Sequence, residues 1–84
     1  MTYATVNKSN PNAMTLQSIG NVLGTPAKNI KKGDNLMWNF GHVEHVDEIL
    51  KETEKMIVVS ISMKSGYKGE RKLLKTRLVC ILNN

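Results

Sequence analysis

Apolar and polar residues alternate along the second half of the chain, in short runs that glycine-containing segments separate. The clearest run is 56–63, where Ile57, Val59 and Ile61 would share one face of a strand. Successive side chains of a strand point to opposite sides, so this period of two indicates a strand with one buried face. Several short strands at close spacing are typical of a small sandwich or barrel. The pattern therefore predicts a mainly β fold.

One further strand is expected on each side of this run. One begins after the Gly33–Asp34 turn and carries large apolar residues at every second position. The other, 70–82, returns after a hairpin loop at 64–69, where glycine can adopt a positive φ. The interior predicted from these runs consists of Leu36, Trp38, Phe40, Ile57, Val59, Ile61, Leu78 and Cys80.

Two segments are ambiguous. In 42–55, Val43, Val46 and Ile49 fall at helical spacing, but a β-bulge would bring the same residues to one side of a strand. In 13–23, Asn12 can cap a short helix, although glycines within and after the segment weaken a helix and a strand fits as well. We expect a short helix in 13–23.

The length of 84 residues is that of one domain, which we divide into an N-terminal arm or short helix, 1–24, and a β-barrel, 25–84. A single cysteine, Cys80, excludes an intrachain disulfide framework and favours a reducing compartment. The longest apolar run, 78–82, is far too short to span a bilayer, and the N-terminus lacks the pattern of a signal peptide. These features predict a cytoplasmic protein without a membrane partner.

The net charge of +5 is unevenly distributed. Residues 42–55 carry five acidic residues against two lysines, whereas 56–84 carry six basic residues against one glutamate. A basic stretch with an aromatic residue among its cations can contact phosphates and stack on bases, although such charges are often only a solvated face. The candidate nucleic-acid-binding residues, which we call the basic hairpin, are Lys64, Tyr67, Lys68, Arg71, Lys72, Lys75 and Arg77.

The aromatic residues permit two interpretations each. Trp38 and Phe40 could stack on nucleobases, but in a chain with so few aromatic residues we expect them in the core. Tyr67 lies at the expected loop tip, where it either stacks on a base or packs on its own hairpin.

Signatures of catalysis or metal binding are weak. His42 and His45 lack the further converging ligands of a zinc site, and residues three apart on a strand face opposite sides. Cys80 lies in an apolar strand end, where cysteine behaves as a buried hydrophobe. The carboxylates of 42–55 form a charged stretch that we expect to be solvated, without a pocket to separate their pKa values. We therefore predict no enzyme, no catalytic residues, no metal and no cofactor.

The stretch 27–41, with its inward-facing turn and Gly33–Asp34 corner before a strand, resembles the opening of SH3-like small barrels. Together with 56–63 and 71–82, it looks like small uncharacterised phage and prophage proteins that share this layout. The resemblance covers 25–82 and implies four to five antiparallel strands, with 42–50 as a strand rather than a helix. It implies no particular activity, since one fold hosts many functions.

Two hypotheses about function follow. The first is a non-enzymatic phage-type accessory protein, in the host cytoplasm, that binds DNA or RNA through the basic hairpin. The second is a protein-interaction module, either a homodimer or an inhibitor of a host factor. In the homodimer, the acidic 42–55 segment of one copy would face the basic hairpin of another.

Overall fold

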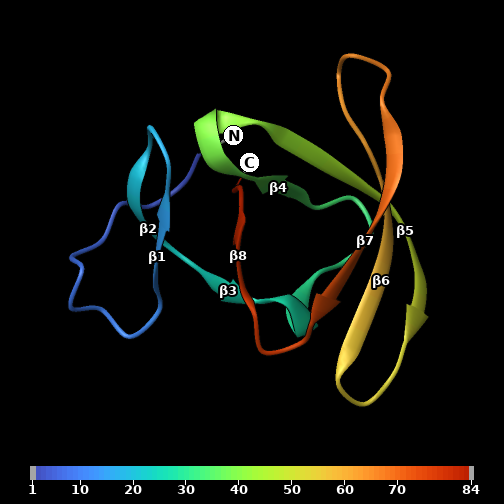
Figure 1. Cartoon of the computed structure of the whole chain (residues 1–84), viewed down its shortest axis with the longest axis horizontal. Coiled ribbons are helices and arrows are strands. Elements are labelled where there is room, and N and C mark those ends of the chain that lie inside the picture. Colours follow the sequence, from blue (N-terminus) through green and yellow to red (C-terminus); the bar gives the residue numbers. More distant parts are fainter. Residues whose placement is uncertain (1, 84) are drawn as a thin grey trace.

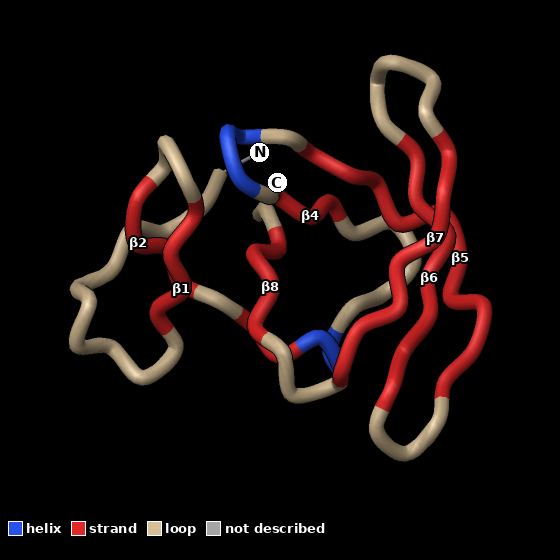
Figure 2. Tube along the Cα trace, in the orientation of Figure 1, coloured by secondary structure: helices blue, strands red, loops and turns tan. Residues whose placement is uncertain are grey.

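The computed structural model describes residues 2–83, which form strands joined by turns (Figures 1 and 2). The elements are β1 (Ala13–Leu16), β2 (Gly20–Leu23), β3 (Thr25–Pro26), the 3-10 turn η1 (Ala27–Asn29), β4 (Asn35–Met37), the 3-10 turn η2 (Asn39–Gly41), β5 (Val43–Glu52), β6 (Met56–Ser62), β7 (Lys68–Leu74) and β8 (Leu78–Ile81). The predicted mainly β fold is confirmed.

The strands form two antiparallel sheets. β1 and β2 make a separate hairpin, and the remaining six strands are ordered β3-β8-β4-β5-β6-β7. The six-stranded sheet curves around a core, with β5, β6 and β7 on one side and β8 and β4 near the middle of the view (Figure 1). Its two end strands, β3 and β7, are not paired with each other within the described residues, so the barrel is not closed. Instead, η1 bridges the gap through Ala27 N–H to Arg77 O (2.8 Å) and Lys28 N–H to Lys75 O (3.1 Å).

The core follows the alternation that the sequence shows. Along β6, Ile57, Val59 and Ile61 are buried and their neighbours are not. Leu36 and Cys80 are buried as predicted, whereas Trp38 and Leu78 are half-buried. The prediction for Phe40 is wrong, because its side chain is 61% exposed. The chain leaves β4 after Met37 and enters η2, in which the backbone N–H of Phe40 donates to Gln17 O (2.8 Å) and the aromatic ring points outward.

Segment 42–55 contains a strand, as favoured above. β5 pairs with β6 from His45 to Glu52, and the register shifts between Val46 and Glu48 and again between Ile49 and Lys51. These irregularities are the bulges that the strand interpretation required. They allow Val46 to lie in the main core while Ile49 packs against it.

The short helix expected in 13–23 is wrong, because this segment is the β1–β2 hairpin. Ser18 and Gly20 both have positive φ in its turn, a conformation that ends any helix there. Leu16 and Val22 are buried against Met37 and Cys80 in a second apolar cluster. The N-terminal segment thus owes its conformation to strands far away in the sequence.

The expected final strand 70–82 is two strands. A turn over 75–77 separates β7 from β8, and the two pair with different partners: β7 with β6, and β8 with β3 and β4. The N–H of Arg77 donates to Leu74 O (3.0 Å) and that of Lys75 to Lys55 O (2.8 Å). This turn carries the chain from one side of the open barrel to the other.

Gly24 lies where the hairpin meets β8, and it is a sensitive packing position. A Cβ at this residue would stand 2.9 Å from Leu78 Cβ and 3.1 Å from Met14 Sδ. We expect Gly24→Ala to lower the free energy of unfolding by about 1–3 kcal/mol, since an added methyl group in a filled space forces the backbone to move. Urea denaturation followed by circular dichroism measures this, and an unchanged midpoint would contradict the close approach.

Candidate nucleic-acid interface

At one end of the core, the inward positions of the sheet become polar. Glu44 precedes the core residue Val46 by two positions on β5, and Arg71 precedes Leu73 by two positions on β7. Because side chains of a strand repeat with a period of two, Glu44 and Arg71 point to the same side as the core. Trp38, which follows β4, packs against the edge of that core. The three side chains therefore meet where the apolar interior ends.

The carboxylate of Glu44 is fully engaged. Arg71 donates from Nε to Oε1 and from Nη2 to Oε2, both at 2.7 Å, and Trp38 Nε1 donates to Oε1 at 2.8 Å. Only 5% of Glu44 is exposed, so its charge needs these partners. The hydrogen bond to Glu44 raises the pKa of Arg71 above its usual value, although burial opposes the shift. Arg71 therefore stays charged and holds the Trp38 indole in place through Glu44.

Two guanidinium groups lie over the Trp38 ring. The Cζ atom of Arg71 is 4.6 Å from the ring centroid and that of Arg77 is 5.3 Å. Arg77 comes from the 75–77 turn, is exposed, and forms no ion pair within the described residues. Cation–π contact orients this guanidinium while its N–H donors remain free for a ligand.

Phe40 extends this surface with an exposed aromatic ring. Its backbone has φ of +64°, a left-handed conformation that a residue with a side chain adopts only at a cost. The Gln17 main chain fixes it, because Gln17 N–H donates to Asn39 Oδ1 (2.9 Å) and Gln17 O accepts from Phe40 N–H (2.8 Å). The ring meets that of His42 edge-on, with centroids 6.5 Å apart. The contacts between η2 and the β1–β2 hairpin therefore fix Phe40 in a strained conformation with its ring exposed.

We call these residues the Trp38 site: Trp38, Phe40, Glu44, Arg71 and Arg77. They surround a hollow of about 470 Å³, to which Asn39, His42 and Met63 also contribute. The Arg77 guanidinium, which has no acidic partner within the described residues, and the exposed Phe40 ring therefore line the same hollow.

The structure divides the basic hairpin. Arg71 and Arg77 meet at Trp38, whereas Lys68 and Lys72 alternate onto the opposite face of β7, and Lys75 pairs with Glu52 at 2.9 Å. Lys64 lies in the β6–β7 loop, beside a second hollow described below.

Tyr67 packs on its own hairpin, which is one of its two interpretations, and stays largely exposed. The ring lies over Gly69, where an added Cβ would be 2.7 Å from Tyr67 Oη, yet 58% of the residue is exposed. Gly69 and Arg71 share one face of β7, so Tyr67 continues the surface of the Trp38 site.

Sequence reasoning missed Glu44 as a site residue. It was assigned to a solvated acidic stretch, whereas it is buried and accepts three hydrogen bonds. The strand interpretation of 42–55 could have identified Glu44 as buried, because it places Glu44 on the same face as Val46. A lone carboxylate on a buried face requires a cation nearby.

Of the residues weighed for metal or thiol chemistry, His42 lines the hollow of the Trp38 site, whereas His45 and Cys80 lie outside it. His45 Nδ1 lies 3.0 Å from Asn35 Oδ1, and no three His, Cys, Asp or Glu side chains in residues 2–83 are grouped as a metal site would require. Burial raises the pKa of the Cys80 thiol, which favours its protonated form.

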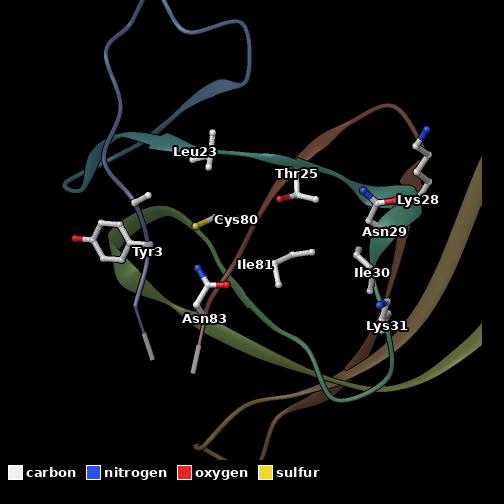
Figure 3. A pocket seen from close by; sticks show the side chains of 11 residues that line it. Tyr3, Leu23, Thr25, Lys28, Asn29, Ile30, Lys31, Cys80, Ile81 and Asn83 are labelled. Carbon is white, nitrogen blue, oxygen red and sulfur yellow. The ribbon is translucent and has the colours of Figure 1, made fainter.

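Another hollow, of about 600 Å³, lies between the N-terminal segment, η1 and β8 (Figure 3). In this view, the Cys80 sulfur and the Ile81 side chain point to opposite sides of β8, and the Tyr3 ring and the Lys28 ammonium group point outward. The charged residues that line this hollow, Lys28 and Lys31, form no ion pair within the described residues that would orient them, in contrast to the Trp38 site.

Comparisons with family models, with curated proteins and with solved structures found no significant match to this chain. Among the described residues, no helix has the length and apolar character needed to cross a membrane.

Proposed function

We propose that this chain is a non-enzymatic accessory protein that binds single-stranded nucleic acid at the Trp38 site. One observation carries the proposal: the Arg77 guanidinium, free of any acidic partner in the described chain, is oriented over Trp38 beside the exposed Phe40. The resemblance to small phage and prophage proteins with SH3-like barrels supports an accessory role of phage type.

The chemistry of the site suits a single strand. A phosphate oxygen can accept from the N–H groups of Arg77, and an unpaired base can stack on Phe40. Tyr67 offers a second exposed ring on the same surface. In a duplex, the base faces are already stacked on one another and cannot reach these rings. Aromatic rings beside a cation therefore favour DNA or RNA with unpaired bases.

The structure offers no observation that favours the alternative, a homodimer held by complementary charge. Three carboxylates of the acidic segment already pair within the chain: Glu44 with Arg71, Glu48 with Lys32 at 3.0 Å, and Glu52 with Lys75. Of the five acidic residues, only Asp47 and Glu54 form no ion pair within the described residues, so less charge remains to attract a second copy. Light scattering distinguishes the hypotheses, because a mass of one chain at high concentration removes the homodimer.

Substituting residues of the Trp38 site should weaken binding in a defined way. With a fluorescent strand of about 12 nucleotides at ~50 mM salt, we expect Phe40→Ala to raise Kd about tenfold, since stacking contributes ~1–3 kcal/mol per base. We expect Arg77→Ala to weaken binding and to reduce the salt dependence by about one phosphate contact. Fluorescence anisotropy measures both effects.

Lys72→Ala is the matched control, because it removes one positive charge from the opposite face of β7. It should change Kd by less than about twofold, as a distant surface charge contributes only a screened, long-range attraction. The proposal is wrong if the unsubstituted protein does not bind the strand, or if Lys72→Ala weakens binding as much as Arg77→Ala does.

A further inference from the structure

A second hollow adjoins the Trp38 site. It has a volume of about 530 Å³ and shares two wall residues, His42 and Met63, with the first hollow. Its remaining walls come from β4, η2, β5, β6 and the β6–β7 loop: Asn35, Gly41, Val43, His45, Ser62, Lys64 and Ser65. The two hollows are therefore neighbours on either side of His42 and Met63.

The second hollow is lined by apolar side chains and by two polar side chains, His45 and Asn35, that contact each other. Val43 and Met63 supply the apolar contacts and are both half-buried. His45 Nδ1 lies 3.0 Å from Asn35 Oδ1, and because an amide oxygen only accepts, Nδ1 donates. In the neutral ring, Nε2 is then an acceptor for a ligand. Asn35 Nδ2 makes no hydrogen bond within the described residues and remains a donor.

An acceptor and a donor beside an apolar wall match a nucleobase, which has flat apolar faces and a polar edge. Ser62 does not take part, because its hydroxyl donates to Asp47 Oδ1 at 3.0 Å. Lys64 stands at the rim and supplies a positive charge for the phosphate that joins two nucleotides. The two hollows thus offer positions for successive nucleotides of one strand.

We propose that the second hollow holds the base next to the one stacked on Phe40 and reads its edge through His45 and Asn35. This inference rests on the proposed function, since the strand must first bind at the Trp38 site. It adds base selectivity, which the Trp38 site alone does not provide. Stacking tolerates every base, whereas hydrogen bonds to a base edge discriminate between bases.

The test compares oligo-dA, oligo-dC and oligo-dT of about 12 nucleotides, a length within the usual single-strand site size. The protein should bind them with Kd values that differ by about three- to tenfold, as expected for one or two hydrogen bonds. His45→Ala should reduce this difference to less than about twofold and leave the weakest-binding strand almost unaffected. Lys51→Ala, on the same strand but outside the second hollow, should keep the preference.

Amide chemical shifts locate the second base independently of affinity. Titration with the preferred strand, followed by ¹H–¹⁵N correlation spectra, should shift Val43, Ser62 and Ser65 in the unsubstituted protein and shift them less in His45→Ala. If the strands bind equally well and these amides do not move, the second hollow is not a base site, although the proposed function stands. If no strand binds, both the proposed function and this inference are wrong.

Discussion

Arg71→Met should lower the free energy of unfolding by about 3 kcal/mol, the lower end of the cost of breaking a buried ion pair. It leaves the Glu44 carboxylate, 7% exposed at its side chain, with only the Trp38 indole as a donor. The lower end applies because the Arg71 side chain is 40% exposed, so water can enter and replace part of the interaction. Chemical denaturation at neutral pH measures the loss.

A double variant identifies the cause as an uncompensated charge. The double variant Glu44→Leu with Arg71→Met should recover most of the stability, since an apolar pair of similar volume can replace a buried ion pair. If the double variant is no more stable than Arg71→Met, packing rather than charge explains the effect.

Leu73→Ala should lower the free energy of unfolding by about 2–5 kcal/mol, because it opens a cavity in the main core. Leu73 is 2% exposed and contributes to the same cluster as Ile57 and Val59. Such a loss is a large fraction of the roughly 5–15 kcal/mol that stabilises a typical domain. Thermal and urea unfolding measure it.

The adjacent leucine is the matched control. Leu74 follows Leu73 on β7, but its side chain points outward and is 53% exposed. Leu74→Ala removes the same atoms and should cost less than about 1 kcal/mol, as is usual for substitutions at the surface. A larger loss in Leu74→Ala than in Leu73→Ala would mean that β7 is shifted by one residue from the observed register.

The mainly β fold could be predicted because apolar and polar residues alternate locally along the strands. In β6, each buried residue is separated from the next by a less buried one, so Ile57, Val59 and Ile61 identify the inner face without further information. The 42–55 segment required more, because its bulges disturb the alternation and imitate helical spacing. There the resemblance to SH3-like barrels favoured the strand that the structure contains.

Predictions were wrong where a distant segment decides the conformation. Residues 13–23 form a hairpin because Leu16 and Val22 are buried against Met37 and Cys80, which no local pattern reveals. Phe40 points outward because the Gln17 main chain, from another hairpin, bonds to η2. The single strand expected over 70–82 is interrupted because β7 and β8 pair with different strands.

By itself, the sequence determined that this chain forms short strands around an aliphatic core and carries its positive charge near the C-terminus. Only the tertiary structure decided which of those charges meet. It divided the basic hairpin, placing Arg71 and Arg77 over Trp38 while Lys68 and Lys72 face the other way. The physical reason is that Glu44 occupies an inward position of β5, and a buried carboxylate is stable only where folding brings it a cation and a hydrogen-bond donor.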